Sequence, residues 1–290
     1  MSEFDNIPNA LTPKNLRFPF SWVGHIPFIM WMMPRLKPKK FVELGTHSGN
    51  SYLAACQSIK QHELNTYCYA VDTWQGDVHA GQYDEDVYKV LCEDHHPNYA
   101  SFSTLMRMTF DEASSQFEDK SIDLLHIDGL HTYDAVKHDF YTWLPKLSDN
   151  AVVLFHDTTV TDRNFGVYKF WDEIRIQYRY TFNFTHCNGL GVLFFNRPYN
   201  NDLLSFLDLD MNETWSNRFA RLGDQVLFHA CFNHVFSSEK NLSFEKKQLI
   251  NLYDSLLHEY NLKVLELENT HTNKKNVFKK IKTKIRRITM

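Results

Sequence analysis

The sequence predicts an α/β fold with a doubly wound, mostly parallel sheet, and three observations support this prediction. From residue 40 to about residue 198, short apolar runs alternate with polar stretches that can form helices, which is the pattern of βαβ units. The first apolar run is followed by a turn with two glycines and then by a helix-forming stretch. Two late apolar runs are separated by Asn188-Gly189-Leu190-Gly191, a turn sequence compatible with a hairpin.

Seven strands are expected in this sheet. Five of them alternate with helices and two form a late pair, at 40–44, 67–72, near 104–109, 122–127, 151–155, and roughly 180–186 and 191–196. The hairpin makes one late strand antiparallel to the others. The expected fold is therefore Rossmann-like, and the helical pattern after Pro198 predicts a helical C-terminal extension.

The turn within residues 41–50 is the most informative stretch of the chain. It reads Phe41-Val42-Glu43-Leu44-Gly45-Thr46-His47-Ser48-Gly49-Asn50, and its two glycines let the backbone turn tightly and approach a ligand closely. A turn that binds NAD has the pattern G-x-G-x-x-G. Glu43 and Ser48 stand where that pattern needs glycine, which argues against a NAD-dependent oxidoreductase. An acid near such a turn can face a cationic amino group of a ligand.

Composition indicates a globular protein in a reducing compartment. Of the 290 residues, 43% are hydrophobic and 15% are aromatic, which is enough for a sizeable core. The five cysteines are odd in number and include no C-x-x-C pair, which argues against a disulfide framework. The N-terminus has no basic region and no long apolar run, so we expect no secretory signal and a cytoplasmic location.

The chain is expected to have four parts. Residues 1–39 are a lead-in in which six prolines leave room for short helices only. Residues 40–198 form the α/β domain, residues 199–273 a helical extension, and residues 274–290 a basic amphipathic tail. In the extension, Leu249, Leu252, Leu256 and Tyr260 recur at helical spacing, which indicates an amphipathic helix that could bind a partner or form a homo-oligomer.

The tail concentrates the positive charge of the chain. Residues 274–287 contain eight lysines and arginines and no acid, and without these eight the chain has 23 basic and 35 acidic residues. An acidic body argues against nucleic-acid binding. The tail itself is either a peripheral contact with an anionic membrane at its inner face or a frayed, solvated terminus.

Two aspartates directly follow predicted strands. Asp128 follows the strand 122–127, and Asp157 follows the strand 151–155 with one residue between. Ligands of an open parallel sheet bind beyond the carboxyl ends of its strands, where these two side chains should lie side by side. Neighbouring carboxylates repel each other unless a cation or a shared proton lies between them. Mg²⁺ or another divalent cation would meet this need, and the alternative is that the aspartates are strand-end caps or cofactor contacts.

The blocks around these aspartates resemble a known family. They read I-D-G-L-H-T-Y-D-A-V-K-H-D-F, then W-x-x-x-L, then an apolar strand that ends in F-H-D-T. Together with the turn E-x-G-x-x-x-G, they are similar to class I S-adenosylmethionine-dependent methyltransferases of a family linked to O-methylation of sugars, polysaccharides and macrolides. The resemblance covers roughly residues 40–196. It implies S-adenosylmethionine as cofactor and a hydroxyl of a sugar or glycan precursor as methyl acceptor.

The resemblance also implies roles for individual residues on the cofactor side. Asp72, at the end of the second strand, would accept hydrogen bonds from the two ribose hydroxyls. The S-adenosylmethionine pocket would be lined by Glu43, Gly45 and Gly49, and the adenine would lie at Thr109, Phe110 and Asp111.

On the acceptor side, the resemblance makes Asp128 and Asp157 the metal ligands and His131 the general base. A histidine near neutral pH can take the proton of a hydroxyl whose pKa a metal has lowered. The alternative for His131 is a helix-start residue with local hydrogen bonds. His156 stands where related metal-dependent enzymes carry an oxygen ligand, and imidazole suits transition metals better than Mg²⁺.

Two further positions have open or structural readings. His95 and His96 precede Pro97 and are expected in a solvated loop, and Trp74 is either a wall of the adenosine pocket or part of the core.

The leading hypothesis is therefore a metal-assisted O-methyltransferase, whose acceptor meets residues 1–39 and 76–103. A second hypothesis is a cofactor-binding assembly module of a glycan-synthesis complex that has no turnover.

Overall fold

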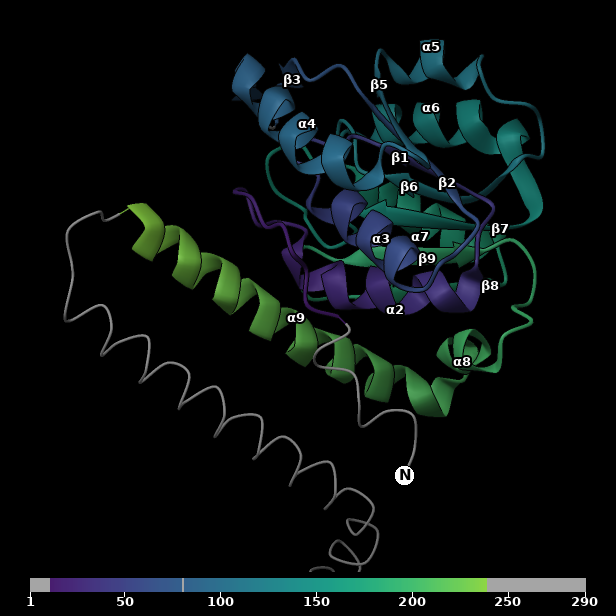
Figure 1. Ribbon diagram of the computed structural model, residues 1–290. Coiled ribbons are helices and arrows are strands. Elements are labelled where there is room, and N and C mark those ends of the chain that lie inside the picture. Colours follow the sequence, from purple (N-terminus) through teal and green to yellow (C-terminus); the bar gives the residue numbers. More distant parts are fainter. Residues whose placement is uncertain (1–10, 80, 239–290) are drawn as a thin grey trace, which may run out of the picture. The chain divides into compact units, whose positions relative to one another are not determined.

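The structure is a computed structural model that describes residues 11–79 and 81–238 (Figure 1). By its internal contacts the chain divides into two units, residues 1–233 and residues 234–290. Of the second unit only residues 234–238 are described. The predicted helix around Leu249–Tyr260 and the basic tail 274–290 lie outside the described residues, so both stay predictions.

The central sheet confirms the predicted α/β fold. It has seven strands in the order β5-β2-β1-β6-β7-β9-β8. Neighbouring strands are parallel, except that β9 runs antiparallel to both β7 and β8. The bounds are β1 (Lys40–Leu44), β2 (Tyr67–Asp72), β5 (Ser103–Arg107), β6 (Ile122–Ile127), β7 (Leu147–His156), β8 (Tyr180–Phe184) and β9 (Leu190–Phe194).

Strands β8 and β9 end two residues earlier than predicted, and β5 and β7 differ from their predicted bounds for local reasons. Strand β7 begins at Leu147, before the apolar run, and Leu147 pairs with Ile122 ahead of an irregularity in the register. The intervening Ser148-Asp149-Asn150 is polar and gave no strand signal. Strand β5 ends at Arg107 because Thr109 already caps the following helix.

Helices cover both faces of the sheet, as Figure 1 shows. One core cluster joins one face to helices α2 (Ile26–Leu36), α3 (Asn50–Gln61), α4 (Glu85–Tyr99) and α9 (Leu209–Ser238). A second cluster joins the other face to α5 (Phe110–Ser114), α6 (Tyr133–Trp143) and α7 (Val167–Gln177). Phe41 belongs to the first cluster and its neighbour Val42 to the second, because successive strand residues point to opposite faces.

The remaining described elements are short. Strands β3 (Gly76–Asp77) and β4 (Gly81–Gln82) form a separate two-stranded sheet. Helix α8 is Asn201–Leu204, and three 3₁₀ turns are η2 (Val23–His25), η3 (Leu144–Lys146) and η4 (Ser205–Leu207).

The described part of the lead-in, residues 11–39, contains a longer helix than its prolines predicted. Its helix α2 has 11 residues, the length of an average helix, and Ile26 to Met33 are all buried. Pro27 lies in the first turn, where a missing N–H leaves no hydrogen bond unmade, and Pro34 lies only in the last turn. The expectation of short helices only did not allow for these two tolerated positions.

Two amide side chains of α3 form hydrogen bonds with the backbone of residues 12–19 in the lead-in. Gln57 donates to the carbonyl of Thr12 at 2.9 Å and accepts from the N–H of Lys14 at 2.8 Å. Asn50 donates to the carbonyls of Arg17 and Pro19 and accepts from the N–H of Arg17, at 2.7, 3.0 and 2.9 Å. Residues 12–19 of the lead-in are therefore hydrogen-bonded through their backbone to side chains of α3.

The prediction of a solvated loop around His95 and His96 is wrong. Both histidines and Pro97 lie within helix α4, and His95 is buried. Its Nε2 lies 2.7 Å from the hydroxyl of Ser103, and burial lowers the pKa of His95 to about 4. Pro97 indicates a loop in the sequence, but it lies within the last turn of α4.

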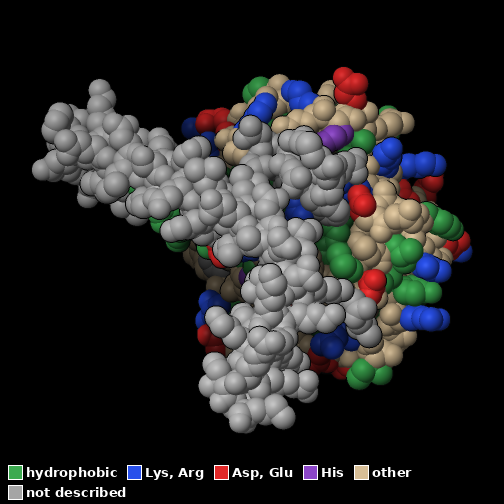
Figure 2. Space-filling view, turned by 90° about the horizontal axis from the view of Figure 1, so that it is seen from below, with side chains coloured by type: hydrophobic (Ala, Val, Ile, Leu, Met, Phe, Trp, Pro, Cys, Tyr) green, Lys and Arg blue, Asp and Glu red, His purple; other side chains and the backbone are tan. Residues whose placement is uncertain are grey.

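The surface carries mixed charge. On the described part of the face shown in Figure 2, basic and acidic side chains are interspersed with hydrophobic ones. Within residues 11–79 and 81–238, no helix combines the length and the apolar character that a membrane span requires.

Candidate active site

A cavity of about 500 Å³ opens at the carboxyl ends of β1, β2, β6 and β7. This volume lies within the range of small-molecule sites. The sequence-predicted residues that line it are Gly45, Asp72, Thr109, Phe110, Asp128, His131 and Asp157. Glu43, Gly49 and Asp111 do not line it.

The turn after β1 is held against both neighbouring strands. The N–H of Gly45 donates to the carbonyl of Val71 in β2, and the N–H of Asp128 donates to the carbonyl of Leu44, each at 2.9 Å. Gly45 has φ +86°, and a Cβ at this position would overlap the backbone carbonyl of Asp128. Glycine is therefore required here for both its conformation and its lack of a side chain.

Gly49 lies outside the cavity, at the end of the turn where α3 begins. It has φ +83° and is the N-cap of α3, and a Cβ there would meet the side chain of Leu91 in α4. Of Glu43, Gly45 and Gly49, which were all predicted to line the cofactor pocket, only Gly45 lines the cavity.

Glu43 is fully buried and pairs with His126 instead of facing the cavity. The indole N–H of Trp22 lies 3.0 Å from Nε2 of His126, and Nδ1 of His126 lies 2.8 Å from Oε2 of Glu43. Because the indole can only donate, Nε2 of His126 is an acceptor and Nδ1 carries the proton that it donates to Glu43. Burial raises the pKa of Glu43, although this hydrogen bond opposes the effect.

Asp72 is positioned by two backbone donors. Its Oδ1 accepts from the N–H of Trp74 at 2.7 Å, and its Oδ2 accepts from the N–H of His47 at 2.9 Å. Each carboxylate oxygen keeps a second lone pair for a ligand hydroxyl. Trp74 itself is buried and donates to the carbonyl of His47 at 2.9 Å, so it belongs to the core.

The three residues predicted at the adenine separate into two groups. Thr109 caps α5 through a capping box with Glu112 and also lines the cavity. Phe110 lines the cavity too, and its ring fills the space beside Gly129 where a Cβ would otherwise stand. Asp111 instead accepts from Nε2 of the exposed His138 at 2.8 Å, on the surface of α5 and α6.

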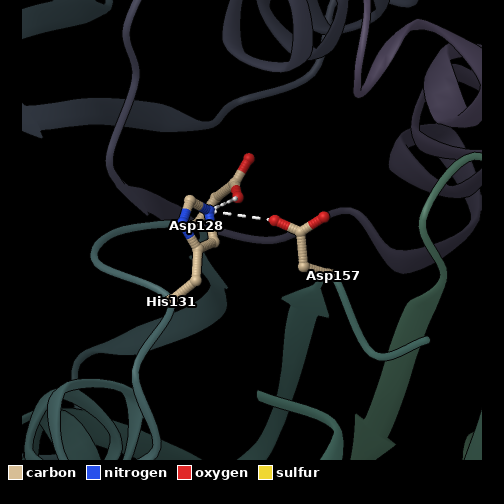
Figure 3. Close-up of side chains that lie close together, drawn as sticks. All are labelled: Asp128, His131 and Asp157. Atoms are coloured by element: carbon tan, nitrogen blue, oxygen red, sulfur yellow. Dashed lines mark ion pairs between the residues drawn. The ribbon is translucent and has the colours of Figure 1, made fainter. Parts of the chain in front are cut away.

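Asp128, His131 and Asp157 converge at the end of β6 and β7 (Figure 3). Nε2 of His131 lies 2.9 Å from Oδ2 of Asp157 and 3.6 Å from Oδ1 of Asp128. Thr132 caps α6 directly after His131, and the carbonyl of His131 accepts from the N–H of Gly166 at 2.7 Å. The two aspartates therefore lie side by side, as the sequence predicted, and His131 joins them.

His156 lies on the buried side of the two carboxylates. Its Nδ1 is 3.1 Å from Oδ1 of Asp128 and 3.5 Å from Oδ2 of Asp157. Burial alone would raise the pKa values of both aspartates, but the charge of His156 and the hydrogen bonds from both histidines outweigh burial and lower them. Two histidines thus compensate the repulsion for which the sequence predicted a cation or a shared proton.

The two carboxylates favour the charged form of His131. Burial alone would lower its pKa, but hydrogen bonds with Asp128 and Asp157 outweigh burial and raise the pKa to about 9. A general base must be unprotonated before the reaction. With no cation bound, the arrangement therefore favours a charged imidazolium as the partner of the two carboxylates. A cation held by these residues would instead bind the neutral imidazole, and the role of general base stays a prediction.

The same residues fit a divalent cation. Among the described residues, Asp128, His131 and Asp157 are the group whose ligand atoms all lie within 4.8 Å of one another. Oδ1 of Asp157 is buried and has no hydrogen-bond partner in the described part of the chain, so it remains available. A mixed set of imidazole and carboxylate donors suits a transition metal better than Mg²⁺.

Several cavity residues had no motif in the sequence. Trp22, His79 and Tyr83 come from the ranges expected to meet the acceptor, whereas Arg163 and Phe165 come from the loop between β7 and α7. Phe165 stacks on His131 with ring centres 4.5 Å apart and an interplanar angle of 7°. Nothing in the sequence marked this loop, because a loop position has no periodicity.

The fold is an α/β domain with a cavity at the carboxyl ends of its strands, and known proteins share parts of it. Residues 42–158 match a family model described as a methyltransferase domain. The matched stretch contains every strand-end residue described above, from Gly45 to Asp157, and covers less than half of the chain.

A curated protein is also similar in sequence. The chain is 49% identical over 177 residues to an uncharacterized protein, y4gI, of Sinorhizobium fredii. The aligned region is 61% of this chain but 19% of that protein, so the chain spans about a fifth of the length of this relative.

Solved structures show a more distant likeness. A methyltransferase of Podospora anserina, PaMTH1, bound to SAH is 17% identical, with a TM-score of 0.46 over 61% of this chain and 82% of that chain. The O-methyltransferase TomG of Streptomyces achromogenes in complex with SAM is 11% identical, with a TM-score of 0.44 over 62% and 81%. A methyltransferase of Geobacter sulfurreducens is 14% identical, with a TM-score of 0.44 over 58% and 75%.

Proposed function

We propose that this protein is an S-adenosylmethionine-dependent O-methyltransferase. The observation that carries the proposal is that the Gly45 turn, Asp72 and the group Asp128, His131 and Asp157 line one cavity. The match of residues 42–158 to a methyltransferase domain supports it. One end of the cavity then serves the cofactor and the other end serves the acceptor.

On the cofactor side, Asp72 offers two oriented oxygens to the ribose hydroxyls. Its backbone donors fix the carboxylate before any ligand arrives, so little conformational freedom is lost on binding. Phe110 supplies an apolar wall at the same end of the cavity, where a purine ring can pack.

On the acceptor side, Asp128, His131 and Asp157 would hold a divalent cation. When bound, such a cation lowers the pKa of an acceptor hydroxyl. His131 is held in place from two sides, by the stacked ring of Phe165 and by the turn that joins its carbonyl to Gly166. We therefore assign His131, as a neutral imidazole, to cation binding in place of the general base that the resemblance implies.

The acceptor that we propose is a hydroxyl of a sugar or glycan precursor. This substrate class rests on the resemblance of the D-G-x-H and H-D blocks to a family linked to such reactions. Trp22, His79 and Phe165 give the cavity the aromatic walls on which sugar rings pack. Contact of the tail 274–290 with a membrane remains a proposal from the sequence.

Calorimetric titration with S-adenosylhomocysteine, with and without Mg²⁺ or Mn²⁺, tests the cofactor. We expect binding by the wild type and none by Asp72→Ala, followed by methyl transfer to members of a panel of sugar nucleotides and glycan precursors. Absence of binding under every condition would refute the proposal. Binding without turnover on the whole panel would support the assembly module instead.

A further inference from the structure

The cavity contains one fixed positive charge. Among the described residues that line it, Arg163 is the only lysine or arginine, and four of the others are aspartates. Carboxylates in this cavity can attract the positively charged sulfonium of the proposed cofactor. Arg163 has no role in the proposed function so far.

Arg163 packs on Phe165, the ring that also stacks on His131. The carbon of its guanidinium is 4.8 Å from the centre of the Phe165 ring, in cation–π geometry. His131 and His79 also stack on Phe165, at 4.5 and 4.7 Å, and their own rings are 5.6 Å apart. Because the two histidines lie so close together, they share one side of the Phe165 ring instead of enclosing it.

The loop holds Arg163 in an uncommon backbone conformation. Arg163 and Asn164 are consecutive residues with φ +49° and +60°, and such left-handed residues other than glycine are uncommon. Two hydrogen bonds fix the loop, from the N–H of Phe165 to the carbonyl of Asp162 at 2.9 Å and from Gly166 to His131 at 2.7 Å. The arginine is thus attached to the segment that also positions His131.

The donors of Arg163 are available to a ligand. Its Nε is 3.6 Å from Oδ2 of Asp162, and both side chains are more than 60% exposed, so this ion pair is weak. A guanidinium presents a planar fork of donors that matches an oxyanion.

We propose that Arg163 binds an oxyanion carried by the methyl acceptor, so that the acceptor is an acidic sugar, either a sugar phosphate or a uronate. This inference rests on the proposed function and specifies its substrate class. The oxyanion would pair with Arg163 at the edge of the Phe165 ring, and the sugar would lie against the aromatic side chains next to Asp128 and Asp157.

The test compares charged and neutral forms of the same sugars. Calorimetry on the full chain loaded with S-adenosylhomocysteine would measure binding of glucose, galactose and mannose, each as free sugar, 1-phosphate and uronate. We expect an acidic form to bind at least about 10-fold more tightly than its free sugar. Which of the two acidic forms binds distinguishes the phosphate from the carboxylate.

Variants connect this preference to Arg163. We expect Arg163→Gln to weaken binding of the acidic sugar about 10-fold and Arg163→Lys to weaken it less, while neither changes affinity for S-adenosylhomocysteine. Arg175→Gln is the matched control, because Arg175 is also exposed and pairs with Asp172 at 3.3 Å but lies outside the cavity.

Three results would overturn the inference: equal binding of acidic and free sugars, equal behaviour of Arg163→Gln and Arg175→Gln, or no binding of any acidic form. Failure of the wild type to bind S-adenosylhomocysteine would instead refute the proposed function, so the two failures are distinguishable.

Discussion

Gly45 lies directly against the backbone carbonyl of Asp128, so closely that a methyl group at position 45 would overlap it. This contact joins the turn after β1 to the end of β6, and the hydrogen bond from Asp128 to Leu44 reinforces it. The proposed cofactor turn and the proposed cation site therefore share one piece of backbone. A substitution that displaces the backbone at Gly45 should therefore also displace Asp128.

Gly45→Ala is expected to destabilise the fold by about 3 kcal/mol or more, because it adds overlap with the backbone to an unfavourable φ. It should also abolish binding of S-adenosylhomocysteine. Gly81→Ala is the matched control, since Gly81 has φ +84° but open space around its Cβ position, and it should cost only about 1 kcal/mol. Urea unfolding and calorimetry would measure both effects, and equal losses in the two variants would show that the overlap is relieved.

Asp72→Asn should weaken binding of S-adenosylhomocysteine about 10-fold or more, because the amide nitrogen that replaces one carboxylate oxygen cannot accept. Asp111→Asn should leave the affinity unchanged, since Asp111 pairs with His138 away from the cavity. Titration of the two variants beside the wild type measures the difference. An equal loss in both would mean that Asp111 approaches the adenine after all, as the sequence predicted.

The ends of the strands were predictable because each of these strands is a run of apolar residues whose end is visible in the sequence. Each of β1, β2 and β6 has the bounds that its apolar run indicated, so the residues after them had to meet at one edge of the sheet. This is why Asp72 and Asp128 were correctly placed. Asp157 was placed by the same argument, although β7 begins earlier than predicted.

Side-chain direction was not predictable from the sequence. Glu43 lies within β1, and its neighbour in the sheet is His126 of β6, which the register pairs with it directly. A buried carboxylate needs a hydrogen-bonding partner, and His126 supplies it. Likewise, Gln57 and Asn50 form hydrogen bonds with the backbone of the lead-in. Every residue type has this backbone, so the lead-in sequence does not indicate these contacts.

Divalent cations are expected to raise the unfolding temperature of the wild type, because an ion that binds only the folded state stabilises it. At about 100 times the dissociation constant, the gain is about 2.7 kcal/mol. Asp157→Asn should remove the response, whereas Asp134→Asn, an exposed change in the first turn of α6, should retain it. Thermal unfolding with Mg²⁺, Mn²⁺ and Co²⁺ would show this, and a wild type that ignores all three ions would contradict the cation site.

Asn50→Ala should cost about 1–3 kcal/mol, since it removes three hydrogen bonds to the lead-in. It should also reduce kcat/KM, because Pro19 and Trp22 line the cavity. Gln57→Ala removes two similar bonds farther along α3, outside the cavity, and should lower stability alone. Equal activity of the two variants would show that the lead-in does not shape the site.

The buried Asp139 of α6 makes stability depend on pH. Burial raises its pKa to about 7, against about 3.9 in an unfolded chain. Between these values the folded state keeps a proton that the unfolded state releases, so the free energy of unfolding falls as pH rises from about 4 to about 7 and then levels off. The slope from this residue is at most about 1.4 kcal/mol per pH unit. Asp139→Asn cannot ionise, so the stability of the wild type relative to this variant should decline over that range in urea unfolding curves. A difference that stays constant from pH 4 to pH 8 would mean that Asp139 is already ionised in the fold.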